Sequence, residues 1–263
     1  MANFESINSK ILTAKTAVVS GAGKGIGRAI TEHFAANGAD VCAISRTASD
    51  LDILQNEIKK AYRVDFFGIT ADISTKNGAL EAVSRILNKF VSIDILVCAA
   101  GYPFQNDIWD RQLVDLDEED FLKVFNVDVL GSFRLIKGIL PVMIKKKKGV
   151  VILFSSTPAI SGYDKGAPYT VAKAASLGLV KDLASEYGRD NIRAYAIAPG
   201  NIKTSRTFDQ LPKEDQMKLE QESPMRRWGS PDEVAEVAVA IASDKMSFVT
   251  GQTIVVDGGT VMF

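Results

Sequence analysis

Seven short apolar runs, spread over a chain of 263 residues, constrain the fold more than any other feature of the sequence. Each run has the length of a strand, and the stretches between them carry apolar residues at helical spacing. Strands that alternate with helices indicate βαβ units and a parallel sheet. The runs are apolar almost throughout, as expected for strands that helices cover on both faces. They lie at 16–20, 40–45, 63–72, 94–100, 149–156, 192–199 and 253–257.

The same alternation predicts a single domain. No linker rich in Pro, Gly or Ser and no internal repeat interrupts it. We therefore expect one doubly wound α/β domain of the Rossmann type over residues 15–263, with a seven-stranded, mostly parallel sheet. Residues 1–14 are expected to form an N-terminal tail. The polar segment 201–223 breaks the alternation before the last helix and strand.

Composition and charge exclude several classes of protein. Hydrophobic residues make up 46% and charged residues 24%, which is typical of a globular protein. The net charge of -1 provides no basic field for nucleic acid. No apolar run is long enough for a signal peptide or a membrane span, so no membrane partner is expected. Cys42 and Cys98 lie in apolar runs, which indicates buried thiols in a reducing cytoplasm rather than a disulfide.

A glycine-rich loop, SGAGKGIG, follows the first apolar run directly. The common G-x-G-x-x-G pattern does not fit it, whereas Gly21, Gly25 and Gly27 match G-x-x-x-G-x-G. Glycine lets the backbone turn sharply and approach a pyrophosphate. The helix that follows offers its free N–H groups to the same anion. This loop predicts a dinucleotide site, with a glycine-rich turn that binds nothing as the alternative.

The end of the second apolar run bears on the choice between NAD and NADP. Ser45 stands where a carboxylate would bind the ribose 2′-hydroxyl of NAD, and Arg46 follows it. Lys24 in the glycine loop adds a second cation. A guanidinium can grip a 2′-phosphate with two charge-assisted hydrogen bonds. These residues favour NADP(H), unless both cations are simply solvated at the surface.

A tyrosine and a lysine, Tyr169 and Lys173, stand four residues apart after Pro168. In a helix they share one face. Ser156 lies thirteen positions before Tyr169, at the end of a predicted strand, where ligands of open α/β sheets bind. Asn126 lies in a helical stretch, where asparagine has poor propensity. Tyr169 and Lys173 alone could be an ordinary pair on a surface helix. Together with Ser156 and Asn126, they predict a site that transfers protons without a histidine.

Taken in order, these motifs resemble the short-chain dehydrogenase/reductase family from about residue 14 to the C-terminus. Further likenesses are the Asp-hydrophobic pair Asp72-Ile73, the segment 198–204 (APGNIKT) and residues 223–259. The resemblance implies a catalytic tetrad of Asn126, Ser156, Tyr169 and Lys173. Tyr169 would exchange a proton with the substrate oxygen, and Ser156 would hydrogen-bond that oxygen. Lys173 would bind the nicotinamide ribose and lower the pKa of Tyr169, and Asn126 would hold a water.

The resemblance also implies the cofactor contacts, and no metal site. The implied contacts are Gly21, Gly23, Lys24, Gly25, Ile26, Gly27, Ser45, Arg46, Asp72, Ile73, Ala99, Ala100, Gly101, Tyr169, Lys173, Pro199, Gly200, Ile202 and Thr204. One departure is that Cys98-Ala99 stands where the family commonly has two asparagines. A side-chain hydrogen bond that ties this strand to its neighbours would then be missing.

The leading hypothesis is an NADP(H)-dependent oxidoreductase that moves a hydride between nicotinamide and a ketone or secondary alcohol. Within the family, the sequence most resembles 3-oxoacyl-(acyl-carrier-protein) reductases, so the substrate could be bound to a carrier protein. The alternatives are a sugar or polyol dehydrogenase, and a non-catalytic dinucleotide sensor. The resemblance further implies a homotetramer and a substrate lid at 201–223. No pattern in the sequence encodes the substrate.

Overall fold

A seven-stranded sheet forms the centre of the molecule. The computed structural model describes residues 10–103, 106–205 and 207–262. All strand pairs in the sheet are parallel, and the order is β3-β2-β1-β4-β5-β6-β7. The strands are β1 (Thr16–Ser20), β2 (Asp40–Ser45), β3 (Phe66–Thr70), β4 (Ile95–Cys98), β5 (Gly149–Phe154), β6 (Ile192–Pro199) and β7 (Gln252–Val256). This confirms the fold predicted from the alternating pattern.

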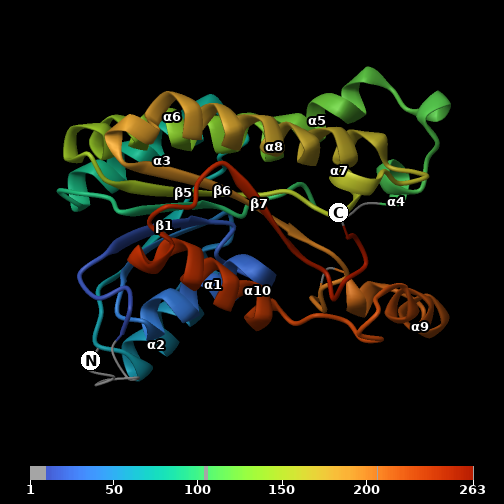
Figure 1. Cartoon of the computed structure of the whole chain (residues 1–263), viewed down its shortest axis with the longest axis horizontal. Coiled ribbons are helices and arrows are strands. Elements are labelled where there is room, and N and C mark those ends of the chain that lie inside the picture. Colours follow the sequence, from blue (N-terminus) through green and yellow to red (C-terminus); the bar gives the residue numbers. More distant parts are fainter. Residues whose placement is uncertain (1–9, 104–105, 206, 263) are drawn as a thin grey trace.

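Helices cover both faces of the sheet (Figure 1). One face carries α1 (Gly25–Ala36), α2 (Ala48–Ala61) and α10 (Pro231–Ala242). The other carries α3 (Lys76–Lys89), α5 (Glu118–Asp128), α6 (Leu130–Lys146) and α8 (Ala167–Tyr187). Three short or peripheral helices lie toward the right end of the view, namely α4 (Asn106–Trp109), α7 (Pro158–Ser161) and α9 (Lys213–Glu222).

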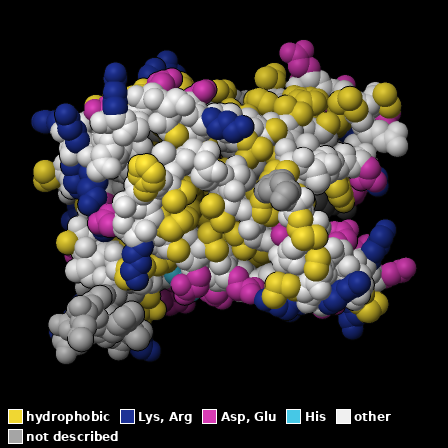
Figure 2. Space-filling model, viewed as in Figure 1, with side chains coloured by type: hydrophobic (Ala, Val, Ile, Leu, Met, Phe, Trp, Pro, Cys, Tyr) yellow, Lys and Arg dark blue, Asp and Glu magenta, His cyan; other side chains and the backbone are white. Residues whose placement is uncertain are grey.

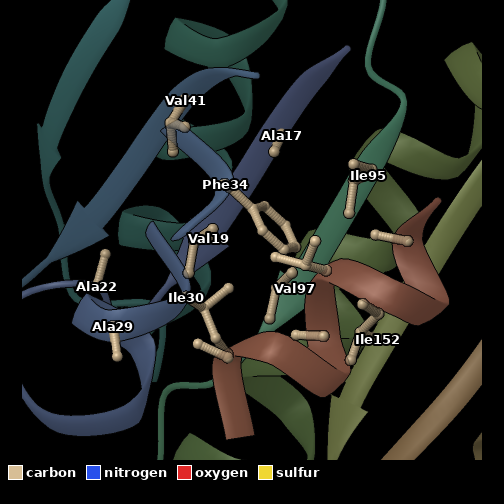
Figure 3. Packing of buried hydrophobic residues seen from close by; sticks show 14 of the residues in the cluster. Ala17, Val19, Ala22, Ala29, Ile30, Phe34, Val41, Ile95, Val97 and Ile152 are labelled. Atoms are coloured by element: carbon tan, nitrogen blue, oxygen red, sulfur yellow. The ribbon is translucent and has the colours of Figure 1, made fainter. Parts of the chain in front are cut away.

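The core on the first face forms where α1 and α10 pack together against the sheet. Figure 3 shows Phe34 and Ile30 of α1 directed toward Val19 of β1 and Val97 of β4, with a further helix beside them. Phe34 and Ile30 have no solvent exposure. Burial of such side chains contributes roughly 1.5–3 kcal/mol each. This packing fixes the position of α1 on the sheet, and therefore that of the glycine loop, which leads into α1.

The two cysteines belong to the core on the opposite face. Cys42 of β2 and Cys98 of β4 are free and buried among the side chains of that face. Burial in apolar surroundings raises the pKa of both thiols to about 12. They remain protonated at neutral pH and act as small hydrophobic groups, as the sequence predicted.

The packed part of the chain begins before the predicted boundary at residue 15. Leu12 has no solvent exposure and belongs to the same core cluster as Phe34. Its N–H group donates a hydrogen bond of 3.0 Å to the carbonyl of Asn37, just after α1. Two apolar residues between polar neighbours are too few to show a period, and so the sequence pattern placed this turn in the tail.

The C-terminal ends of the parallel strands meet along one edge of the sheet. The strand order reverses between β1 and β4, so the loops that follow these two strands diverge there. Such a switch point is the usual ligand site of an open α/β sheet. The strands β1, β2, β4, β5 and β6 end along this edge, at Ser20, Ser45, Cys98, Phe154 and Pro199 respectively.

Candidate active site

A cavity of about 760 Å³ follows the C-terminal edge of the sheet. This volume suits a small molecule or cofactor. Its walls come from the glycine loop, the loops after β2, β4, β5 and β6, and the start of α8. The lining includes every cofactor contact that the sequence predicted, from Gly21 to Thr204. It also includes Ser156, Tyr169 and Lys173.

The glycine loop lies against the loop after β4, and Gly21 makes this possible. Gly21 has a φ of +70°, and a Cβ there would stand 2.7 Å from the backbone nitrogen of Ala100. Gly27 is equally constrained, because a Cβ would stand 2.4 Å from the carbonyl oxygen of Gly21. Only glycine fits both positions without moving backbone. No side chain caps the start of α1 among the described residues, so its first N–H groups remain available to an anion.

The next part of the cavity carries charges of both signs. Lys24, Ser45 and Arg46 line it, as predicted. A carboxylate that the sequence analysis missed lies among them, since Asp50 Oδ1 is 3.7 Å from Lys24 Nζ. An acidic residue in the first turn of a helix is ordinarily explained by the helix dipole, so nothing in the sequence distinguished Asp50 from such a residue. The positive charge offered to a cofactor phosphate is therefore reduced by one neighbouring carboxylate.

Tyr169 and Lys173 lie one turn apart on α8 and face the cavity together. Lys173 Nζ is 5.6 Å from the centre of the Tyr169 ring. The Tyr169 ring also contacts Trp109 of α4, with 4.2 Å between ring centres. Ser156 follows β5, and its hydroxyl donates a 3.4 Å hydrogen bond to the carbonyl of Pro199. The structure thus brings together three of the four predicted catalytic residues.

Lys173 is buried, and its ammonium has protein partners. Nζ lies 2.7 Å from Asp128 Oδ1 and donates a 3.3 Å hydrogen bond to the carbonyl of Phe154. Burial, the largest single influence, would by itself lower the pKa of Lys173. The charges of Asp128 and Tyr169, with the hydrogen bond to Asp128, outweigh it together, so the pKa lies above its ordinary value. Lys173 is therefore a cation at neutral pH.

Asn126, the fourth predicted catalytic residue, is not among the described residues that line the cavity. It lies two positions before Asp128 on α5, and two residues of an α-helix turn the side chain by about 200°. Asp128 faces Lys173, so Asn126 faces elsewhere. Asn126 was predicted because asparagine is unusual inside a helix, and its catalytic role stays a prediction.

The loop after β4 is tied down in spite of the departure at Cys98-Ala99. The hydroxyl of Ser20 donates to the carbonyl of Val97 and accepts from the N–H of Ala100, both at 3.4 Å. Asp128 Oδ2 accepts a 2.7 Å hydrogen bond from the N–H of Tyr102. Two side chains from other elements thus supply the connection that the sequence analysis expected to be missing.

The outer part of the cavity is polar and carries several carboxylates. Tyr163 lines it, and burial raises the pKa of this tyrosine, followed by the charges of Asp164, Glu222 and Asp110. The segment 201–223 forms one wall, with Leu211 and Leu219 among its lining residues. Its role as a lid stays a prediction.

The basic run 145–148 lies at the other end of the sheet. It directly precedes β5, whose far end leads to Ser156. Lys146 pairs with Asp94, and Lys148 Nζ lies 3.2 Å from Asp244 Oδ2. Two of the four lysines are therefore paired with carboxylates, and the run lies away from the cavity.

Two further findings apply to the part of the chain that the structure describes. No helix there is both long and apolar enough to cross a membrane. No cluster of three or more His, Cys, Asp or Glu side chains there could hold a metal ion.

Comparison with known proteins gives concordant matches over nearly the whole chain. A family model described as enoyl-(acyl carrier protein) reductase matches residues 21–261. The 3-oxoacyl-(acyl-carrier-protein) reductase of Thermotoga maritima is 36% identical over 252 residues, which cover 95% of this chain and 99% of that protein. The corresponding reductase of Rickettsia felis is 33% identical, over 95% of this chain and 98% of that protein.

Solved structures agree closely in fold. The L-sorbose reductase of Gluconobacter frateurii, complexed with NADPH and L-sorbose, has a TM-score of 0.91 and 27% identity, over 97% of this chain and 99% of that one. A 3-oxoacyl-(acyl-carrier protein) reductase of Brucella melitensis with bound NAD has a TM-score of 0.88 and 29% identity, over 97% and 94%. The two neighbours hold different nicotinamide cofactors, although both folds match this chain closely.

Proposed function

Starting from the fact that this chain belongs to the short-chain dehydrogenase/reductase family, we propose that it is an NADPH-dependent reductase of ketones. As a member it is an NAD(P)-dependent oxidoreductase acting on CH–OH groups or the corresponding carbonyls. The observation that carries the finer proposal is a single cavity joining the glycine loop, Arg46 and the group of Ser156, Tyr169 and Lys173. Membership of an enzyme family, with Tyr169 and Lys173 both in the cavity, argues against the alternative of a non-catalytic dinucleotide sensor.

The residues present fit a dinucleotide. Gly21 and Gly27 allow the tight turn that sets the glycine loop against the loop after β4, and the start of α1 supplies N–H groups for the pyrophosphate. Asp72 and Ile73 would contact the adenine, and the segment from Pro199 to Thr204 would border the nicotinamide. When bound, the reduced cofactor supplies the hydride.

The protein supplies the proton and the polar contacts. Tyr169 donates its hydroxyl proton to the carbonyl oxygen, and the hydroxyl of Ser156 stabilises the charge that develops there. The ammonium of Lys173 has three N–H donors, of which Asp128 and the carbonyl of Phe154 take two. The third is left for the ribose of the cofactor. The positive charge of Lys173 beside the Tyr169 ring favours loss of the phenolic proton.

Two substrate classes are supported by different observations. The identity to 3-oxoacyl-(acyl-carrier-protein) reductases supports a 3-oxoacyl thioester. The carboxylates around the outer cavity, Asp110, Asp164 and Glu222, favour instead an uncharged polar substrate such as a ketose, because they would repel an acidic carrier protein. The fold of L-sorbose reductase agrees with this second class. The two classes are distinguished by kcat/KM with NADPH, measured for 3-oxoacyl thioesters, small ketones and ketoses. The class with the higher value is the favoured one.

Replacement of Tyr169 by Phe tests the proton-donor role. With the best ketone of that panel, we expect Tyr169→Phe to lose about 10²–10⁴ in turnover while NADPH affinity is nearly unchanged. Tyr163→Phe is the matched control, since it removes a hydroxyl from the same cavity and is expected to keep most of the activity. A folded Tyr169→Phe protein that retains more than about a tenth of the turnover would contradict the role.

Replacement of Arg46 tests the preference for NADPH. Arg46→Asp turns attraction of the 2′-phosphate into repulsion, and loss of one charged contact costs about 1.5–3 kcal/mol. The ratio of kcat/KM for NADPH to that for NADH is therefore expected to fall at least tenfold. Lys60→Asp makes the same charge change on the exposed side of α2 and should leave the ratio unchanged. A wild-type protein that already prefers NADH would refute the proposed preference at once.

Assembly as a homotetramer is also proposed, from the family resemblance and two surface features. Leu122 of α5, Phe133 of α6 and Val171 of α8 are exposed apolar side chains on one helical face. Figure 2 shows hydrophobic side chains gathered where α8 lies. β7 forms an open edge of the sheet with half-buried apolar residues, which is a ready pairing surface. Light scattering at micromolar concentration should give four times the chain mass, and a monomer mass would refute the proposal.

A reducing cytoplasm stays the predicted location. It is supported by the two free, buried thiols, which neither pair with each other nor lie at the surface. Fractionation of the cells that make the protein would test it, and recovery of the protein outside the cytoplasm would contradict it.

A further inference from the structure

We propose that Asp128 is a positioning residue that holds the ammonium of Lys173 and, through its own charge, keeps Tyr169 protonated, so that the site favours carbonyl reduction. This inference rests on the proposed function, because it assigns a direction to the proton transfer at Tyr169. Its test therefore includes a measurement that does not need catalytic turnover.

The contacts of Asp128 support the positioning role. Oδ1 lies 2.7 Å from Lys173 Nζ, and Oδ2 accepts a 2.7 Å hydrogen bond from the N–H of Tyr102. The carboxylate thus joins three segments, namely α5, α8 and the loop after β4. Without Asp128 the ammonium would keep only the 3.3 Å hydrogen bond to the carbonyl of Phe154.

The burial of the pair makes its charges matter. The side chains of Lys173 and Asp128 are only 9% and 1% exposed. Solvent screens such charges weakly, so each acts on neighbours within several ångströms. A lone ammonium 5.6 Å from the Tyr169 ring centre would strongly favour the phenolate. A carboxylate paired with that ammonium cancels much of this effect, and Tyr169 then keeps its proton at higher pH.

The other titratable groups around the pair are few among the described residues. Tyr169 faces it from α8, and Tyr102 adjoins it in the loop after β4. Cys98, at the end of β4, packs on the start of α6, and burial raises the pKa of its thiol to about 12. Since Cys98 is neutral at the pH values of interest, Asp128 supplies the negative charge that opposes Lys173.

The direction of the effect follows from the two half-reactions. Reduction of a ketone requires Tyr169 with its proton, and oxidation of an alcohol requires Tyr169 without it. The carboxylate of Asp128 therefore extends the pH range of reduction upward. It moves the onset of oxidation upward by the same amount.

The test is Asp128→Asn, which keeps the size of the side chain and an oxygen that can accept from Tyr102. Ionisation of Tyr169 is followed by the ultraviolet absorbance of phenolate, as the difference between each protein and its own Tyr169→Phe counterpart. We expect the midpoint for Tyr169 to fall by about one pH unit in Asp128→Asn. The alkaline limb of ketone reduction and the onset of alcohol oxidation should shift by the same amount.

Asp120→Asn is the matched control. Asp120 is another buried, ion-paired aspartate of α5, bound to Arg111 and Lys123, so its loss costs stability without changing the charge beside Lys173. It is expected to leave the Tyr169 midpoint in place. Asp128→Ser, also neutral but smaller, is expected to give the same shift as Asp128→Asn and serves if the amide variant does not fold.

An unchanged Tyr169 midpoint in a folded, neutral Asp128 variant would overturn the proposal, even if melting temperature and activity fall. A shift of the same size in Asp120→Asn would overturn it as well. If the wild-type protein reduces no ketone with NADPH, the proposed function fails. The absorbance titration still decides the role of Asp128 in that case.

Discussion

The ammonium of Lys173, buried beside Tyr169, is the interaction on which the candidate active site depends. An unpaired buried cation would cost several kcal/mol, so it persists only because other groups compensate it. Here Asp128 and the carbonyl of Phe154 do so, from α5 and from the end of β5. The charge of Lys173 therefore depends on how α5 and α8 are placed relative to the end of β5. Because α5 packs against α6 and α8, and α8 packs against β5 and β6, the charge lies beside Tyr169.

The glycine loop imposes the second constraint. Its backbone approaches the loop after β4 so closely that a single Cβ at Gly21 would collide with Ala100. That approach brings the start of α1 and the loop after β4 to the two sides of one cavity. The same β4 loop is tied to Asp128, which contacts Lys173. The cofactor half and the catalytic half of the site thus share the loop after β4 as a common wall.

Much of this arrangement could be predicted from the sequence, for identifiable reasons. Strands buried on both faces leave continuous apolar runs, so the sheet was predictable, and glycine spacing and the Tyr169–Lys173 interval indicated the two halves of the site. Asp128 and Asp50 could not be found in this way. Each is an acidic residue on a helix, and only the packing of that helix against another element reveals that the side chain lies beside a lysine. Leu12 escaped notice because two apolar residues carry no period.

The central claim, that this cavity transfers a hydride to a carbonyl carbon, is tested most directly with labelled cofactor. NADPH that carries deuterium at the transferred position is incubated with the protein and the best ketone of the panel, and the alcohol is analysed by mass spectrometry. The account predicts an alcohol that contains one deuterium at the former carbonyl carbon for each NADPH oxidised. Oxidation of NADPH without a labelled alcohol, or an alcohol without deuterium, would contradict it.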